Sequence, residues 1–162
     1  MKEGSGNANL AIAWKYPGKI REVIPATYSR RMKPFPEITI EAESYLWMQG
    51  VQTQHSSNVG GGMNVAHIDT GDWMSYPEVT IPSTGAYTVE YRISSGSGGG
   101  TLQLEKAGGT PVYGTVSIQN TGGWQNWQTV SHTVNLDAGP IAFGIKAIVG
   151  GWNINWFRIT KN

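Results

Sequence analysis

The spacing of turns constrains the fold of this chain more than any other feature of its sequence. From residue 38 onward, stretches of alternating apolar and polar residues are interrupted about every 8 to 12 residues by glycine, proline or asparagine. Such alternation is typical of strands whose side chains point to opposite faces. The 22 glycines and the lack of long apolar patterns with a helical period argue against helices. The sequence therefore predicts an all-β protein, a β-sandwich of roughly nine antiparallel strands.

The clearest strand patterns lie at 38–45, 72–81, 86–94, 101–106, 111–118, 127–136, 141–149 and 154–160, with 48–54 as a further candidate. One of these strands contains Pro77. Proline cannot donate a hydrogen bond to a neighbouring strand, so Pro77 is expected at a bulge or at a sheet edge.

The charge changes along the chain and divides it into two parts. Residues 1–36 carry seven Lys and Arg against two Asp and Glu, whereas residues 37–162 carry five against nine. We expect an N-terminal segment at 1–36, ending in a basic, proline-containing linker, and a β-sandwich domain at 37–162. The acidic domain argues against a nucleic-acid partner, because phosphate binding requires Lys and Arg. Long apolar runs and cysteines are absent, which argues against a transmembrane helix and excludes disulfides and thiolate metal sites.

Four of the seven tryptophans lie in two similar stretches, GGWQNWQ and GGWNINWF. Trp127 and Trp156 lie inside strands with apolar neighbours and are expected in the core. Trp124 and Trp152 each follow a Gly-Gly pair and are expected to form a surface platform. The amides beside them belong to Gln125, Asn126 and Asn153. A flat indole stacks on the apolar face of a sugar ring, and amides bind adjacent hydroxyls, so this pattern favours a carbohydrate site.

Two carboxylates, Glu41 and Glu43, are two residues apart on an expected strand and therefore share a face. Like charges this close repel one another unless a cation lies between them, and calcium prefers such oxygen ligands. Candidates for a further ligand are Asn155 and Asp137. The alternative is that one glutamate faces solvent while the other pairs with Arg92 or Arg158.

The remaining polar residues do not form a recognisable catalytic motif. Asp69 and Asp72 flank a turn at Gly71, where Asp side chains commonly bond the backbone. A glycosidase pair would have to face each other across a cleft. The histidines His55, His67 and His132 are scattered, without the spacing of a zinc site.

Six segments follow one another in a characteristic order over about residues 38–161: IEAESY, GVQTQ, NVGGGMNVAHIDTGDWMSY, GAYTVEYRIS, GGWQNWQTV and GGWNINWFRI. In this order they resemble a family 6 carbohydrate-binding module. The resemblance implies a jelly-roll β-sandwich that binds polysaccharide without catalysis. It also implies an extracellular, secreted protein in which the module is linked to a catalytic domain such as a glycoside hydrolase. We expect a monomer with no membrane partner.

By this resemblance, the family's cleft tryptophan corresponds to Trp124 and its asparagine to Asn153. A second cleft aromatic corresponds to His67 and a cleft glutamate to Gln54, and both are departures from the family pattern. Histidine offers a smaller apolar face, and glutamine replaces a charged acceptor by a neutral amide. Trp152 and Asn64 complete the expected carbohydrate-binding set.

The resemblance also implies a structural calcium ion. Its ligands would be Glu41 and Glu43, completed by Asn155 and a loop carbonyl near Gly61. The phrase GGGMNVAHIDTGDWMSY is similar to modules of enzymes that act on agar, so an agarose-type galactan is the favoured ligand, with xylan and β-1,3-glucan as other family ligands.

Alternatives remain for both parts of the chain. The domain could be a structural or protein-binding sandwich with the Trp loops as its interface, or a small β-sandwich lyase or hydrolase. Within residues 1–36, ANLAIAWKYPGK and REVIPATY resemble the last hairpin of a protective-antigen-type β-domain. A linker with some strand character is the alternative there.

Overall fold

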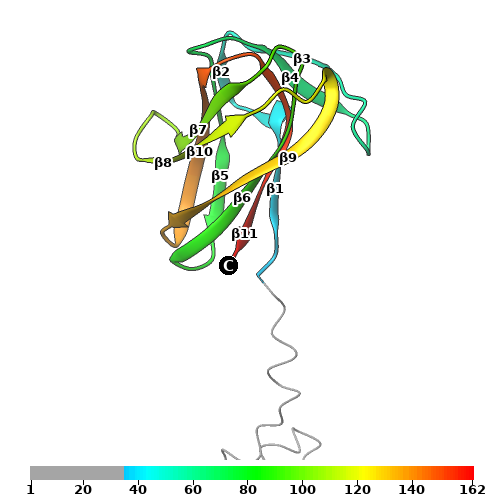
Figure 1. Cartoon of the computed structure of the whole chain (residues 1–162). Helices are drawn as coiled ribbons and strands as arrows, with labels where there is room; N and C mark the ends of the chain where they lie inside the picture. Colours follow the sequence, from blue (N-terminus) through cyan, green and yellow to red (C-terminus); the bar gives the residue numbers. More distant parts are fainter. Residues whose placement is uncertain (1–34) are drawn as a thin grey trace, which may run out of the picture. The chain divides into compact units, whose positions relative to one another are not determined.

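The computed structural model describes residues 35–162, which form two antiparallel β-sheets packed face to face (Figure 1). The elements are β1 (Ile38–Glu41), the 3₁₀ helix η1 (Ala42–Ser44), β2 (Trp47–Gln49), β3 (Gln52–His55), β4 (Met63–Ile68), β5 (Trp73–Ile81), β6 (Gly85–Ser95), β7 (Gly100–Lys106), β8 (Val112–Ile118), β9 (Gly123–Leu136), β10 (Gly139–Val149) and β11 (Trp152–Lys161). The predicted all-β sandwich is therefore confirmed, with more strands than expected.

The strand order shows how the two sheets share the chain. One sheet has the order β3-β4-β11-β6-β9, with β1 also paired to β11, and the other has the order β2-β5-β10-β7-β8. Consecutive strands often lie in different sheets, as β4 and β5 do, so the chain repeatedly crosses the sandwich. β11 begins at the end of the sandwich away from the C-terminus (Figure 1).

The core lies between the sheets and follows from alternation within each strand. In β7, Leu102 and Leu104 are fully buried whereas Gln103 between them is not. Phe157 packs edge-on against Tyr76, with 5.0 Å between the ring centroids. Burial of each large apolar side chain contributes about 1.5–3 kcal/mol, so this interior is the main source of stability.

Two expected strands are broken by local structure that alternation does not reveal. The 38–45 strand ends at Glu41, and η1 follows, where Ser44 Oγ donates a hydrogen bond to the Glu41 carbonyl at 2.7 Å. The 48–54 strand is divided at Gly50, which has a φ of 83°. A side chain there would overlap the Asp72 carboxylate, so glycine is required at this turn between the two sheets.

Pro77 lies where the pairing of β5 with β10 shifts. Ala142 pairs with Glu78 and Gly144 pairs with Ser75, so two residues of β5 lie opposite one residue of β10. The prediction of a bulge at Pro77 is therefore confirmed, and the missing N–H is tolerated because the ladder is interrupted there.

Residues 1–34 lie outside the described part, so the hairpin-like tail and linker predicted at 1–36 remain a prediction. Among the described residues, no helix has the length and hydropathy needed to span a membrane.

Candidate functional site

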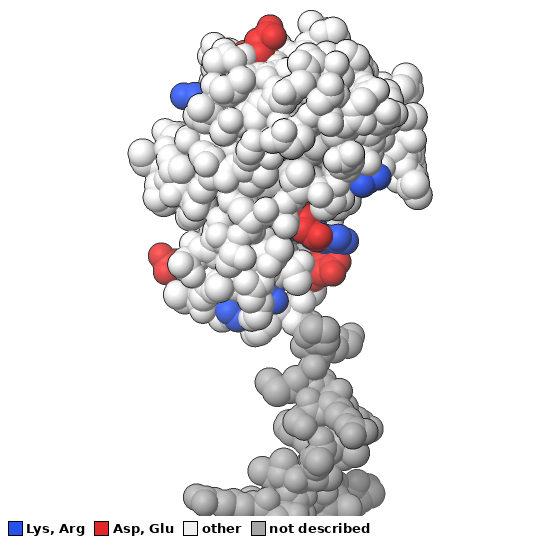
Figure 2. Space-filling view, in the orientation of Figure 1, with Lys and Arg blue, Asp and Glu red and all other residues white. Residues whose placement is uncertain are grey.

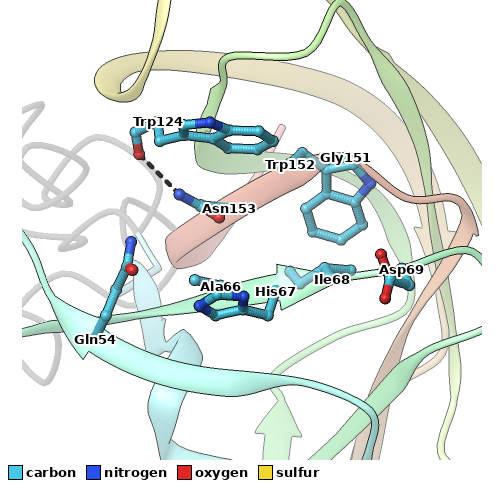
Figure 3. A pocket seen from close by; sticks show the side chains of 9 residues that line it. All are labelled: Gln54, Ala66, His67, Ile68, Asp69, Trp124, Gly151, Trp152 and Asn153. Carbon is cyan, nitrogen blue, oxygen red and sulfur yellow. Dashed lines mark hydrogen bonds between the residues drawn. The ribbon is translucent and has the colours of Figure 1, made fainter.

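A cleft of about 440 Å³ opens at one end of the six-stranded sheet, and we call it the end cleft (Figure 3). It is lined by Gln54, Ala66, His67, Ile68, Asp69, Trp124, Gly151, Trp152 and Asn153. Most of these residues come from β3, β4, the start of β9 and the start of β11, whereas Asp69 directly follows β4 and Gly151 directly precedes β11. The four strands belong to one sheet, in which β6 lies between β11 and β9. The structure thus brings together five of the six residues expected to bind carbohydrate.

Trp124 provides the exposed aromatic surface of the end cleft, and 47% of the residue is accessible to solvent. Its carbonyl accepts hydrogen bonds from Ser94 Oγ and from Asn153 Nδ2, both at 2.7 Å. Its indole lies against Gly96, where an added Cβ would come within 2.9 Å of Nε1. The backbone and ring of Trp124 are therefore both held in place, which makes the ring a ready surface for stacking.

Asn153 lies beneath Trp124 and is 2% exposed. Its Nδ2 faces the Trp124 carbonyl, as the dashed line in Figure 3 shows. A carbonyl can only accept, so this contact determines which end of the amide is nitrogen. The Asn153 Oδ1 receives no hydrogen bond from the residues described, and it faces the cleft between Trp124 and His67 (Figure 3).

His67 lies on β4 with an unusual backbone conformation. Its backbone φ is 54°, a value that residues other than glycine seldom adopt. The pairing of β4 with β11 shifts here, because Trp152 pairs with Ile68 and Ile154 with Val65. This bulge turns the His67 side chain outward into the cleft. Strained residues of this kind cost about 1–3 kcal/mol and cluster at functional sites.

The prediction that Trp152 forms part of an exposed platform is wrong. Trp152 is fully buried, and its Nε1 donates a hydrogen bond to the Val149 carbonyl at 2.8 Å. Its ring packs against Gly100, which has no Cβ in the way. It therefore forms a wall of the end cleft and cannot present a free ring face.

Trp127 and Trp156, which were expected in the core, are only partly buried. Trp156 lies under the Arg158 guanidinium, 5.0 Å from the ring centroid. The reason is a second register shift, between Ile154 and Trp156, in the pairing of β11 with β6. The shift reverses the alternation, so Trp156 no longer faces the core as Trp152 and Ile154 do.

Asn64 and Gln125, two amides expected at the cleft surface, lie under it instead. Asn64 is fully buried and its Oδ1 accepts a hydrogen bond from Gln125 Nε2 at 3.3 Å. The Gln125 Oε1 accepts from Ser57 N at 2.8 Å and from Trp127 Nε1 at 3.2 Å. The prediction that Asn64 contacts a ligand is therefore not matched by its position. Gln125 thus ties the start of β9 both to Ser57 and, through Asn64, to β4.

Asp69 and Asp72 form the turn that the sequence predicted. Asp69 N donates to Asp72 Oδ2 at 2.8 Å, Asp72 N donates to the Asp69 carbonyl at 3.1 Å, and Gly71 has a φ of 99°. The carboxylate of Asp69 itself lines the end cleft, a position that the sequence pattern did not indicate (Figure 3). The available signal in the sequence was the position of Asp69, two residues after His67.

The expected metal ligands converge on a second hollow of about 440 Å³, which we call the carboxylate hollow. It is lined by Thr39, Glu41, Glu43, Val59, Gly60, Gly61, Gly62, Asn155, Trp156 and Arg158. The two glutamates do not share a strand as expected, because Glu43 lies on η1, yet both reach the hollow. Desolvation raises the pKa of Glu41, and the charge of Glu43 raises it further.

The alternative in which an arginine neutralises one of these glutamates is not seen within residues 35–162. Arg158 pairs with Glu90 at 2.8 Å and with Glu37 at 3.4 Å. Arg92 donates to Asn58 Oδ1 at 3.1 Å and to Thr129 Oγ1 at 3.3 Å. In the same part of the chain, the buried Oε2 of Glu43 has no hydrogen-bond partner. A buried carboxylate oxygen without a partner is costly, so the hollow fits a bound cation.

A third hollow, of about 520 Å³, lies on the five-stranded sheet and we call it the tryptophan hollow. Trp47, which is 72% exposed, and Trp73 line it together with Glu105 and Lys146. Trp73 Nε1 donates a hydrogen bond to Gln49 Oε1 at 3.2 Å. The sequence pattern predicted no site on this face.

His132 is part of the sheet structure and lies outside the three hollows. The Tyr91 hydroxyl and His132 Nε2 are 2.9 Å apart, between β6 and β9. Desolvation lowers the pKa of His132, which favours the neutral ring.

Among the described residues, no group of three or more His, Cys, Asp or Glu side chains could hold a metal ion by itself, so a cation in the carboxylate hollow would need carbonyl or amide oxygens as well.

Comparison with known proteins identifies the family. Residues 41–161 match the family model of the carbohydrate binding module (family 6). The clotting factor G alpha subunit of Tachypleus tridentatus is 47% identical over 122 residues, which cover 75% of this chain and 18% of that protein. The chain thus spans less than a fifth of this curated relative.

Two solved modules match over nearly their whole length. A module of Cellvibrio mixtus lichenase 5A in complex with cellotriose is 54% identical, with a TM-score of 0.76 over 77% of this chain and 97% of that one. The C-terminal module of LamC, a marine laminarinase from Zobellia galactanivorans, is 52% identical, with a TM-score of 0.74 over 78% of this chain and 100% of that one. The chain therefore belongs to family 6 of the carbohydrate-binding modules, which are non-catalytic binding domains.

Proposed function

We propose that the end cleft is the polysaccharide-binding site and that Trp124 stacks on a sugar ring there. The observation that carries this proposal is the half-exposed Trp124 indole, fixed beside the outward-facing Asn153 Oδ1 and His67. Covering about 100 Å² of indole by a sugar contributes about 2.5 kcal/mol. Asn153 orients the ring through a hydrogen bond to a hydroxyl, and His67 adds a smaller flat surface.

A single site of this kind binds weakly, with a Kd between about 1 μM and 1 mM. Weak binding suffices when the module is joined to an enzyme, because the linked catalytic domain is then held near its polymer at a high effective concentration. We propose that the full-length protein is such an enzyme and is extracellular. The link of similar modules to a lichenase and a laminarinase supports this assignment.

We infer that a β-glucan is the first ligand to test. The two solved modules described above share more than half of their residues with this chain and come from enzymes named for β-glucan substrates. The sequence-based preference for an agarose-type galactan, and the alternatives of xylan or β-1,3-glucan, remain predictions that the same experiment compares. The tryptophan hollow offers a second aromatic surface on which a longer glucan chain could lie.

We propose that the carboxylate hollow binds a structural calcium ion through Glu41, Glu43 and the Asn155 side-chain oxygen, with carbonyls of the loop 56–62 near Gly61. The unpartnered Glu43 Oε2 and the mutual charge repulsion of the two glutamates support this proposal. Asn58 Nδ2 donates to Asn155 Oδ1 at 2.6 Å, which orients the amide oxygen and leaves a second lone pair. When bound, calcium supplies positive charge that holds these oxygens together.

Affinity electrophoresis tests the binding proposal. The purified chain is run through gels that contain laminarin, barley β-glucan, xylan or agarose, as the wild type, Trp124→Ala and Trp47→Ala. We expect retardation by at least one glycan and about a 30-fold or larger loss of affinity in Trp124→Ala, as the area covered implies. Trp47→Ala is the comparison variant: it removes the exposed ring of the tryptophan hollow, on the other sheet, and so tests that surface separately.

Other results would change the assignment. A loss confined to Trp47→Ala would move the site to the tryptophan hollow. Migration unchanged by every glycan would overturn the carbohydrate proposal and favour the protein-binding alternative.

A further inference from the structure

The end cleft contains one carboxylate side chain, that of Asp69, and no Lys or Arg side chain. Of the nine residues that line it, only Asp69 belongs to the Asp, Glu, Lys and Arg types. Figure 3 places its carboxylate at one end of the cleft beside Trp152, opposite the end occupied by Gln54. Charged side chains are also sparse on the face of the domain shown in Figure 2. A ligand in this cleft therefore meets the Asp69 carboxylate without a Lys or Arg side chain to compensate it, and His67 is the other titratable side chain of the lining.

The Asp69 carboxylate is available to a ligand because the fold does not use it. In the turn at 69–72 the bonding carboxylate is that of Asp72, which accepts from Asp69 N. Within residues 35–162, no hydrogen bond or ion pair involves the Asp69 side chain. Asp72 thus carries the structural role, and the Asp69 side chain is free for another.

The turn itself is braced by the chain around Gly150, so Asp69 is held in a defined position. Gly150 N donates to Thr70 Oγ1 at 3.0 Å, and Gly151 N donates to the Ile68 carbonyl at 2.9 Å. A Cβ at Gly150 would come within 2.5 Å of the Ile68 carbonyl oxygen. The backbones on both sides of Asp69 are therefore packed together.

Asn153, like Asp69, presents a hydrogen-bond acceptor to the end cleft. Its Nδ2 is committed to the Trp124 carbonyl, which Ser94 Oγ also donates to. Reversing the amide would place Oδ1 against that carbonyl, so Asn153 can offer only an acceptor to the cleft. The end cleft thus has two fixed acceptors, Asn153 Oδ1 and the Asp69 carboxylate.

Two fixed acceptors recognise groups that donate. A free sugar hydroxyl donates, whereas the sulfate group of a sulfated sugar or the carboxylate group of a uronate carries no donor at neutral pH and adds a negative charge. Bringing such an anion beside Asp69 is unfavourable, since like charges repel and no Lys or Arg of the cleft offsets the loss of hydration.

We propose that Asp69 is a specificity-determining residue, which together with Asn153 makes the end cleft select glycans with free hydroxyls and reject sulfated or uronate-bearing glycans. This inference rests on the proposed function of the end cleft. It adds the chemical class of the ligand and a residue that neither the sequence pattern nor the comparisons assign.

The test compares each neutral glycan with an anionic form of the same polymer. Laminarin and agarose, and a sulfated derivative of each, are titrated calorimetrically into the wild type, Asp69→Asn and Asp137→Asn. Asp69→Asn keeps the size of the side chain and removes the charge. Asp137→Asn is the matched control, because Asp137 is exposed in the turn after β9, at the opposite end of that strand from Trp124.

We expect the wild type and Asp137→Asn to bind the neutral polymer at least about 10-fold more tightly than its sulfated form, as repulsion by one nearby charge implies. In Asp69→Asn this ratio should fall about threefold or more, through stronger binding of the sulfated form. The weak binding of the sulfated form to the wild type should strengthen with added NaCl, because salt screens the repulsion. A lower affinity in salt would contradict the mechanism.

The outcomes separate this inference from the proposal beneath it. Equal binding of neutral and sulfated polymers by the wild type, or an unchanged ratio in Asp69→Asn, overturns the inference while leaving the end cleft as a glycan site. Failure of the wild type to bind either neutral polymer overturns both. The melting temperature of Asp69→Asn should match that of the wild type, which shows that any change reflects the cleft.

Discussion

Replacing Gln125 with methionine tests whether one amide beneath the surface holds the Trp124 side of the end cleft in place. Gln125 accepts hydrogen bonds from Ser57 N and Trp127 Nε1 and donates one to Asn64 Oδ1. Methionine preserves the length of the side chain and removes all three. The three lost bonds differ in energy, because their partners differ in exposure.

Ser57 is exposed, so its freed N–H can bond water at little cost. Asn64 is fully buried, and its Oδ1 has no other donor among the described residues. A buried acceptor left unpaired costs about 1–3 kcal/mol, and an ordinary hydrogen bond contributes about 1 kcal/mol. We expect the free energy of unfolding to fall by about 2–4 kcal/mol and Tm to fall by about 6–15 °C for a domain of this size.

The assay is thermal and urea unfolding of Gln125→Met, followed by calorimetric titration with the glycan that the wild type binds. Affinity should weaken about 3- to 10-fold, or by roughly 1 kcal/mol, because Trp124 loses the support of its neighbour. The control is Gln128→Met, the same substitution at an exposed site on β9, which should change stability by less than about 0.5 kcal/mol. A loss below about 1 kcal/mol in Gln125→Met would show that another group or water satisfies Asn64, and the reasoning would fail.

Two further predictions concern the carboxylate hollow and His132. Calcium should raise the melting temperature of the wild type relative to the same protein in EDTA, by the equivalent of about 2.7 kcal/mol at 100 times its Kd. Glu43→Gln should lose this gain, whereas the control Glu78→Gln, at an exposed site on β5, should retain it. Identical melting of the wild type in calcium and in EDTA would refute the site. Desolvation holds the pKa of His132 below its ordinary value of 6.5 in the folded domain, so the unfolded chain takes up the proton first. The stability that the neutral His132 contributes should therefore be fully present above about pH 6.5 and decline as the pH falls below it. Urea unfolding between about pH 5 and pH 8 should show this dependence of the free energy of unfolding on pH in the wild type, and a weaker dependence in His132→Gln. An equal dependence in both proteins would contradict the assignment.

The strands of the domain and their buried faces could be predicted from the alternation of apolar and polar residues along the chain. Alternation such as that of Leu102, Gln103 and Leu104 identifies a strand and its buried face, because successive side chains of a strand point in opposite directions. Glycines and prolines mark where strands end. Similarity to a known family then brought Trp124, Asn153, His67 and Gln54 to one cleft, and Glu41 and Glu43 to one hollow.

Where a strand is irregular, the same logic failed. Trp152 and Trp156 are four residues apart and would share a face in a regular strand, yet one is buried and the other lies under Arg158 on the outer face. The bulge between them depends on the pairing of β11 with two neighbours that are distant in the sequence. No property of the eight letters GGWNINWF indicates it.

The polarity of the end cleft was likewise decided by tertiary contacts. An asparagine can present a donor or an acceptor, and only the Trp124 carbonyl, 29 residues away, makes Asn153 an acceptor. Asn64 and Gln125 have the same side-chain chemistry as cleft amides but bond each other beneath the surface. The sequence thus determined the sandwich, its strands and the residue types available for binding, because these depend on near neighbours. Which groups face the ligand, and with which polarity, was decided only by the three-dimensional structure, because each depends on hydrogen bonds and strand register between distant segments.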